Sequence, residues 1–276
     1  STEIHKFVEK MLANYHTHTT YCDGKEEIEV FIKKALELKL QHLGFSSHAP
    51  ISIQTKWAIS DENMLEKYSQ EILKYKNQYQ NQIELFLSLE IDYIPNTTAS
   101  FAEIKSKYNL DYTIGSIHLV KIPNTNDIWF VAGKSEFFED GFKKYFNFDV
   151  KKAIKIYYHQ ICEMIENEHF DIIAHFDKIK LNADKYFDES EKWYIDAVNE
   201  ALWLMKEKNI ILEANTRSFY QKKRTDIYPS DFIIEQARLL NIPIIVSSDA
   251  HHSNELTEGF EFTFAKLKQY GYKSHI

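Results

Sequence analysis

The chain has 276 residues, of which 44% are hydrophobic and 27% are charged, so it is long enough for one large globular domain with a real core. A net charge of −8 argues against a nucleic-acid-binding protein that relies on a basic surface, although a nuclease with a local positive groove is not excluded. Two cysteines cannot build a disulfide framework, and no membrane-length apolar run or secretory signal is visible, so we expect a cytoplasmic protein.

Strands and helices are expected to alternate along the whole chain. Residues 1–10 precede the first strand and are a candidate extension, because Met11 could be a natural start. The expected strands cover residues 11–15, 42–46, 83–93, 112–117, 170–174, 210–214 and 242–246. Apolar residues three and four apart predict helices near 28–38, 61–80, 98–108, 154–165, 189–208, 231–240 and 256–270. This order predicts one α/β domain over residues 1–276, and seven units suit a barrel better than an open sheet.

The segment between the fourth and fifth strands, residues 119–149, is long and rich in aromatic residues. It has no clear strand, and we expect a lid-like insertion with one short helix. Its aromatic side chains are better explained by packing in the core and the lid than by a platform for stacking bases.

Polar side chains mark the carboxyl ends of the expected strands, which is where functional residues lie in α/β barrels. His16 and His18 stand two residues apart at the end of the first strand, so both point to one face and can grip one metal ion. Asp249 and His251 repeat this spacing after the last strand. The remaining candidate ligands are Asp23, His48, Glu90, His118 and His175.

These nine groups exceed what a single ion needs, and imidazole and carboxylate suit zinc, iron or manganese. We therefore expect two or three divalent ions that share carboxylates. A water held between such ions becomes a nucleophile near neutral pH, which predicts metal-assisted hydrolysis of a phosphoester. Glu90 lies in an apolar run, where a carboxylate is costly to bury unless it binds a cation. Asp23 is a weaker candidate, because aspartate before glycine is common in turns.

Arginine is scarce in this lysine-rich chain, yet Arg217 and Arg224 both follow the sixth strand. Guanidinium binds phosphate with paired donors that lysine lacks, so this placement predicts phosphate capture. A solvated basic loop over residues 222–224 is the alternative for Arg224. Asp177 and His252 are candidates for the general acid that protonates the leaving alcohol.

Six short motifs occur in a fixed order along the chain. They are His16-Thr17-His18, Ser47-His48-Ala49-Pro50, Glu90-Ile91-Asp92-Tyr93-Ile94-Pro95, Gly115-Ser116-Ile117-His118, Ala174-His175-Phe176-Asp177 and Ser248-Asp249-Ala250-His251. Each motif alone is weak, but the ordered set resembles the polymerase-and-histidinol-phosphatase (PHP) superfamily. The second to fourth motifs, together with the stretch 215–229, resemble its histidinol-phosphatase branch.

The resemblance implies a distorted (β/α)7 barrel with three divalent metal ions and a small-molecule phosphate ester as substrate. By motif, the first ion would be held by His16, His18, Glu90 and Asp249. Glu90 would bridge to a second ion on His118 and His175, and the third would lie on His48, His251 and Asp23. The implied reaction is hydrolysis of L-histidinol phosphate to L-histidinol and phosphate in histidine biosynthesis. The arginines do not map cleanly onto the family pattern.

Three alternatives stay open. Another PHP phosphoesterase, such as a nucleotide phosphatase or a 3'-5' exonuclease, is disfavoured by the acidic charge balance and by the lack of a fused polymerase or helical repeat. A non-catalytic member would have lost several ligands, whereas all nine are present. An amidohydrolase-like zinc barrel would typically use a carboxylated lysine, and no lysine is suitably placed at a strand end. Nothing in the sequence indicates an oligomeric state.

Overall fold

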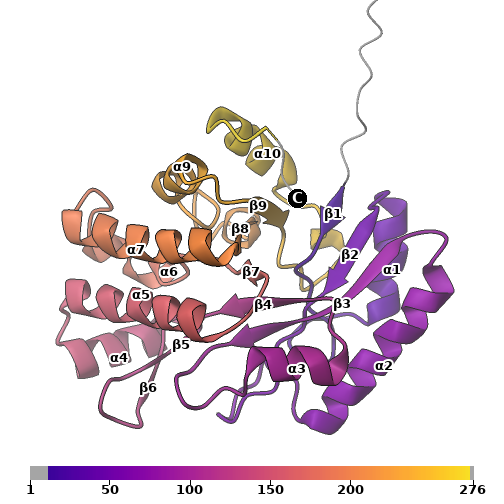
Figure 1. Cartoon of the computed structure of the whole chain (residues 1–276), viewed down its shortest axis with the longest axis horizontal. Coiled ribbons are helices and arrows are strands. Elements are labelled where there is room, and N and C mark those ends of the chain that lie inside the picture. The colour runs from indigo at the N-terminus through magenta and orange to yellow at the C-terminus, as the bar shows by residue number, and fades with distance from the viewer. Residues whose placement is uncertain (1–11, 274–276) are drawn as a thin grey trace, which may run out of the picture.

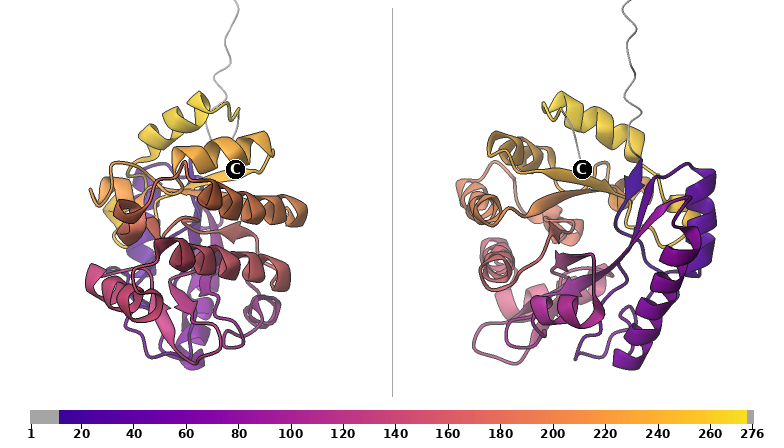
Figure 2. Two further views of the ribbon diagram at one scale, coloured as in Figure 1. Left: turned by 90° about the vertical axis from the view of Figure 1, so that its left-hand side faces the viewer. Right: turned by 45° about the vertical axis from the view of Figure 1, so that its right-hand side comes forward.

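Seven parallel strands form one sheet in the computed structural model, which describes residues 12–273; the candidate extension, residues 1–10, lies outside this part. The strand order is β1–β2–β3–β4–β7–β8–β9, so the predicted seven-stranded parallel sheet is confirmed. The helices lie around the outside of the curved sheet (Figures 1 and 2). The strands are β1 (Ala13–Asn14), β2 (His42–Phe45), β3 (Glu84–Asp92), β4 (Tyr112–Ser116), β7 (Ile172–Ile173), β8 (Ile211–Asn215) and β9 (Ile244–Ser247).

The two edges of the sheet meet just beyond the carboxyl ends of β1 and β9. Thr17 and Ala250 form a parallel bridge there. The His18 N–H donates to the Ala250 carbonyl at 2.8 Å, and the Ala250 N–H donates to the His16 carbonyl at 3.2 Å. The barrel is therefore nearly closed, and its closing contact brings the first and the last predicted metal-binding motifs side by side.

Helices connect successive strands, as the alternation predicted. The longer ones are α1 (Ile28–Glu37), α2 (Glu62–Tyr79), α3 (Phe101–Tyr108), α5 (Val150–Asn167), α7 (Lys192–Lys208), α9 (Asp231–Leu239) and α10 (Phe260–Gln269). The short ones are α6 (Lys180–Ala183), α8 (Arg217–Tyr220) and the 3-10 turns η1 (Asp184–Tyr186) and η2 (Ser253–Glu255). Within residues 12–273, no helix combines the length and the apolar character that crossing a membrane requires.

The segment 119–149 differs from its prediction. It contains two antiparallel strands, β5 (Leu119–Lys121) and β6 (Ile128–Phe130), followed by α4 (Ser135–Phe146). The expectation of no strand is wrong because three-residue strands are too short to show an alternating pattern. Trp129 of β6 is buried against Phe138 and Phe146, so these aromatic side chains do pack in the core.

The inside of the barrel holds a small apolar cluster that we call the interior plug. Its members are Tyr15, Tyr112, Ile114, Ile172, Ala174 and Ile245. Successive residues of a strand alternate between the two faces of a sheet. On β8, Ile211 contacts the plug, so Glu213 and Asn215 also point inward, while Leu212 packs in the outer core. The strands therefore place polar side chains inside the barrel beyond the plug.

Candidate metal centre

Glu90 lies at the centre of a largely buried cluster that contains all nine predicted metal ligands, of which Asp23 and His118 are partly exposed. Its Oε2 is 3.0 Å from His16 Nε2 and 3.3 Å from both His18 Nε2 and His48 Nδ1. Its other oxygen, Oε1, is 3.0 Å from His175 Nε2 and 3.8 Å from His118 Nε2. The two oxygens of one carboxylate thus face two different sets of imidazoles, which is the arrangement of a carboxylate that bridges two cations.

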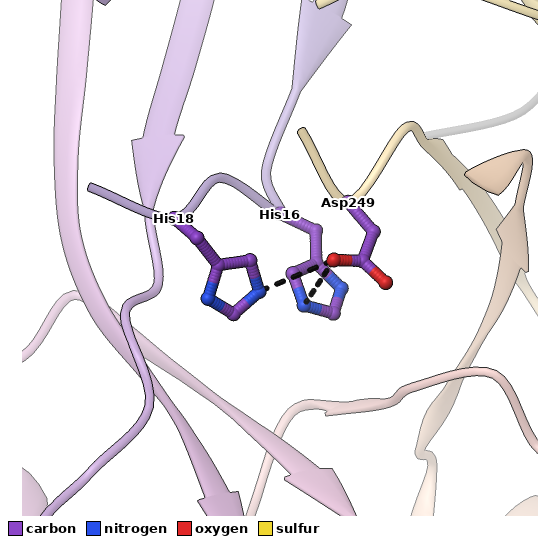
Figure 3. A group of neighbouring side chains, drawn as sticks. All are labelled: His16, His18 and Asp249. Atoms are coloured by element: carbon purple, nitrogen blue, oxygen red, sulfur yellow. Dashed lines mark ion pairs between the residues drawn. The ribbon is translucent and has the colours of Figure 1, made fainter. Parts of the chain in front are cut away.

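Asp249 completes one side of the cluster. Its Oδ1 lies 3.2 Å from His18 Nε2 and 3.8 Å from His16 Nε2. Figure 3 shows both imidazole rings directed toward this carboxylate, as the spacing of the two histidines predicted. Asp249 has a positive φ of 53°, so the chain turns sharply after β9 and aims the side chain at the end of β1.

Asp23 closes the opposite side, in the turn before α1. Its Oδ1 is 3.1 Å from His251 Nε2, 3.8 Å from His18 Nδ1 and 4.0 Å from His48 Nε2. The nine predicted ligands and Asp92 form overlapping groups of three whose ligand atoms all lie within 4.8 Å of one another. These groups are His16–His18–Asp249, His18–His48–Glu90, His18–Asp23–His251, His48–Asp92–His118 and Glu90–His118–His175.

Several buried atoms of this cluster have no hydrogen-bond partner among the described residues. They are His18 Nε2, His48 Nδ1, His175 Nδ1 and Asp23 Oδ1. Leaving a buried polar atom unpaired costs free energy, so such atoms normally have a partner that satisfies them. Imidazole nitrogens and carboxylate oxygens at these separations are ligands for a divalent cation, and the residues therefore fit a metal centre.

Burial and neighbouring charges shift the pKa values of the cluster's histidines in both directions, lowering those of His48 and His175 and raising those of His16 and His18. Burial lowers the pKa of His48 to about 3 and that of His175 to about 4, so both imidazoles are neutral near pH 7, the form that binds metal. Burial opposes ionisation of Glu90, but the neighbouring histidines hold the pKa of its carboxyl well below the usual range. Burial alone would lower the pKa of His16. The carboxylates of Glu213, Asp249 and Glu90 outweigh burial and raise this pKa to about 10. The proton on His16 balances part of the charge of these carboxylates. A metal ion bound to His16 would displace that proton and balance the same charge.

Two further buried carboxylates orient histidines of the cluster, and neither was predicted to be a site residue. Asp92 Oδ1 lies 2.8 Å from His118 Nδ1, and Glu213 Oε1 lies 2.6 Å from His16 Nδ1. A carboxylate that accepts from Nδ1 fixes the tautomer and leaves Nε2 free for a metal. Both acids sit in apolar strands, so the reasoning that selected Glu90 would also have found them.

A pocket of about 200 Å³ opens beside the cluster. Six of its lining residues are predicted ligands, and three others are cations, namely Lys178, Arg217 and Lys223. Arg217 was predicted, and its Nη1 donates to the Asp249 carbonyl at 2.6 Å. The two lysines were missed because only guanidinium groups were considered as phosphate ligands. Trp57, Ala132, Gly133 and Leu181 complete the lining.

The structure does not bring Arg224 or His252 to this pocket. Arg224 Nη1 donates to the Lys180 carbonyl at 2.9 Å and to the Asp184 carboxylate at 2.6 Å, so its guanidinium contacts the first residue of α6 and the residue that follows this helix. His252 is exposed and precedes η2. Asp177 is buried, accepts the Ser230 N–H at 3.0 Å and does not line the pocket either. Proximity to a strand end in sequence does not decide where a loop directs a side chain.

Comparisons with known sequences point to one family. The model of the PHP domain matches residues 14–217. A curated relative from Deinococcus radiodurans is 25% identical over 257 residues, which cover 92% of this chain and 91% of the relative. The histidinol-phosphatase of Bacillus subtilis is 23% identical over 269 residues, covering 89% of this chain and 96% of that protein.

Solved structures share the fold. A protein from Listeria monocytogenes superimposes with a TM-score of 0.79 at 18% identity, covering 91% of this chain and 99% of that one. A histidinol phosphate phosphatase from Lactococcus lactis, complexed with zinc, L-histidinol and phosphate, has a TM-score of 0.71 at 20% identity, covering 96% and 95%. These likenesses and the strand order confirm the predicted distorted (β/α)7 barrel. The PHP domain model matches well over half of the chain, and the chain therefore belongs to the PHP domain family.

Proposed function

We propose that this protein is a metal-dependent histidinol phosphatase, which hydrolyses L-histidinol phosphate to L-histidinol and phosphate. The name of the Bacillus subtilis relative and the ligands of the Lactococcus lactis structure support this substrate. The observation that carries the reaction type is the position of Glu90, whose two oxygens face separate sets of histidines beside a pocket lined with cations. That arrangement suits hydrolysis of a phosphoester better than binding alone.

We propose three divalent ions, chosen among zinc, manganese and iron. The first lies on His16, His18, Glu90 and Asp249, the second on Glu90, His118 and His175, and the third on His48, His251 and Asp23. When bound, such ions supply Lewis acidity and a bound water of lowered pKa. The first two groupings are supported by sets of three ligand atoms that lie within 4.8 Å of one another. The third is supported by Asp23 Oδ1, which lies 3.1 Å from His251 Nε2 and 4.0 Å from His48 Nε2.

The cationic wall of the pocket is the proposed phosphate site. Arg217 is held against the Asp249 carbonyl, so its guanidinium is fixed next to the ligand cluster. Lys178 and Lys223 add two ammonium groups to the same pocket. Charge-assisted hydrogen bonds from these three groups would orient the phosphate and balance its charge. Arg224, His252 and Asp177 have no part in this proposal, because none of them lines the pocket.

The other wall would enclose the leaving alcohol. Trp57 lies in the loop before α2, and its ring stands edge-on to Phe130 of β6, with ring centroids 6.1 Å apart. Ala132 and Gly133 follow β6 and line the same pocket. We therefore propose that segment 119–149 acts as a lid that keeps bulk water from the reacting phosphate.

The test is an assay of the purified protein, loaded with manganese or zinc, on L-histidinol phosphate, glycerol phosphate and p-nitrophenyl phosphate. We expect kcat/KM for L-histidinol phosphate to exceed the others by at least about 10-fold, since the wall of Trp57, Ala132 and Gly133 would make apolar contacts that the other two leaving groups do not match. An Asp249→Asn preparation controls for contaminating phosphatases. Equal turnover of all three esters, or faster digestion of single-stranded DNA, would reject the proposed substrate in favour of another PHP phosphoesterase.

A further inference from the structure

Glu213 is a fully buried carboxylate that none of the predicted roles uses. It is the third residue of β8 and points into the barrel, with 0% of its surface exposed. Burying a carboxylate is costly unless its oxygens find partners. The partners of Glu213 are therefore informative about its role.

Each oxygen of Glu213 serves a different ligand of the metal cluster. Oε1 accepts from His16 Nδ1 at 2.6 Å. Oε2 accepts from the backbone N–H of His175 at 2.9 Å and from Asn215 Nδ2 at 3.0 Å. The same Asn215 nitrogen lies 3.3 Å from Asp249 Oδ2. One carboxylate thus reaches three proposed metal ligands, two directly and one through Asn215.

The contact with His16 fixes which nitrogen faces the cluster. A carboxylate can only accept, so Nδ1 carries the proton and Nε2 is directed to Glu90 Oε2, 3.0 Å away. A carboxylate behind a metal-binding imidazole also makes that imidazole a stronger ligand.

The contact with His175 fixes a strained part of the backbone. His175 has a φ of 25°, a value that residues other than glycine rarely adopt. The bond from its N–H to Glu213 holds this turn and so places His175 Nε2 at 3.0 Å from Glu90 Oε1. His16 and His175 therefore meet opposite oxygens of Glu90, and Glu213 holds both.

We propose that Glu213 is a positioning residue that couples the metal sites on the two sides of Glu90. Asp92 offers the natural contrast. Among the proposed ligands, it accepts hydrogen bonds only from His118, through the backbone N–H and Nδ1 of that residue. Losing Glu213 should then weaken binding on both sides of Glu90, whereas losing Asp92 should weaken it on one. The proposal rests on the proposed ligand set but not on the identity of the substrate.

The test compares Glu213→Gln with Asp92→Asn in metal titrations against a chromophoric chelator, followed by a count of ions per chain. Every group that contacts Glu213 donates a hydrogen bond. A glutamine at this position would direct its own NH2 group at one of these donors, so that hydrogen bond would be lost. We expect Glu213→Gln to lower the affinity of at least two classes of site by about 10–100-fold, and Asp92→Asn to lower that of one class. Circular dichroism of both variants checks that the fold is retained.

A folded Glu213→Gln protein with wild-type affinity at every site would overturn the proposal, and so would a loss confined to one class. If Glu213→Gln does not fold, Glu213→Asp replaces it. A side chain shorter by one methylene cannot reach both His16 and His175, so unchanged affinity in Glu213→Asp would overturn the proposal equally. None of these titrations uses L-histidinol phosphate. A wild-type protein that binds metal normally but does not hydrolyse this ester would therefore reject the proposed substrate without affecting Glu213.

Discussion

The inside of the barrel contains two neighbouring regions whose central residues are equally buried and chemically opposite. The interior plug is apolar, and both of its hydroxyl groups have partners: that of Tyr112 donates to the Tyr15 carbonyl, and that of Tyr15 lies 2.6 Å from His42 Nδ1. The ligand cluster is as buried, with His16 and His18 0% exposed and Glu90 1%. It nevertheless contains buried nitrogen and oxygen atoms that lack hydrogen-bond partners among the described residues.

This difference separates the part of the core that stabilises the fold from the part that needs a ligand. Burying the plug is favourable by itself, at about 25 cal/mol per Å² of apolar surface. Burying imidazoles and carboxylates without partners is unfavourable, and cations between them would remove that cost. The two regions should therefore respond in opposite ways to substitution and to metal.

The largest effect is expected from Glu90→Gln. This change removes the charge that both sets of histidines share, while the shape of the side chain is kept. We expect the loss of ions on both sides of Glu90 and a fall in kcat/KM of more than about 100-fold. Substitution of residues that only hydrogen-bond to metal ligands already lowers metal affinity or activity by about 10–100-fold. Metal counts and steady-state kinetics measure this. Wild-type metal content and activity would contradict the bridging role.

Truncation of the plug should give the opposite phenotype. Ile114 is fully buried inside the barrel, and Ile114→Ala leaves a cavity that should lower the free energy of unfolding by about 2–5 kcal/mol. Chemical denaturation measures this loss. At saturating metal, the folded variant should bind as many ions as the wild type. A drop in ion number would show that the two regions are not separable.

The cationic wall should affect the substrate rather than the metal. Lys178→Ala and Lys223→Ala each remove a charged donor from the pocket, and charged hydrogen bonds contribute about 1.5–3 kcal/mol, or roughly 10–100-fold in kcat/KM. Steady-state kinetics and inhibition by inorganic phosphate measure the change. Lys192→Ala is the matched control, because this exposed lysine pairs with Asp196 on the surface. Equal effects from all three substitutions would argue against a phosphate site.

The smallest effect is expected from Arg224→Ala. Arg224 pairs with Asp184 outside the pocket, so its loss should cost about 1 kcal/mol of stability and leave KM unchanged. Arg217→Ala should instead raise KM, because Arg217 lines the pocket. Thermal unfolding and kinetics of the two variants distinguish the roles. A raised KM in Arg224→Ala would show that the loop brings this arginine to the substrate.

The fold and the core of the site were largely predictable from the sequence. Polar residues such as His48 and Glu90 mark the carboxyl ends of successive strands. Parallel strands bring these ends to the same side of a barrel. The nine ligand candidates were found because histidines and acids in apolar surroundings are conspicuous. Their convergence follows because all but Asp23, which lies in the turn before α1, stand in a strand or within four residues of its carboxyl end.

What escaped prediction depends on contacts between distant segments. The β5–β6 hairpin was missed because its strands are too short to show periodicity. Glu213 stands out in the sequence as an acid in an apolar strand, but its contact with His16 spans 197 positions, and nothing local indicates which ligand it touches. Lys178 and Lys223 are ordinary loop lysines until the folded loops place them in the pocket. Arg224 and His252 failed to reach it for the same reason, because loop paths are set by tertiary packing.

The number of divalent ions per chain tests the central claim most directly. The purified wild-type protein is loaded with zinc, manganese or iron, desalted and subjected to elemental analysis, with Glu90→Gln treated in parallel. We predict three tightly bound ions in the wild type and fewer in Glu90→Gln. A folded wild-type protein that retains no ion after this treatment would contradict a barrel built to be completed by cations.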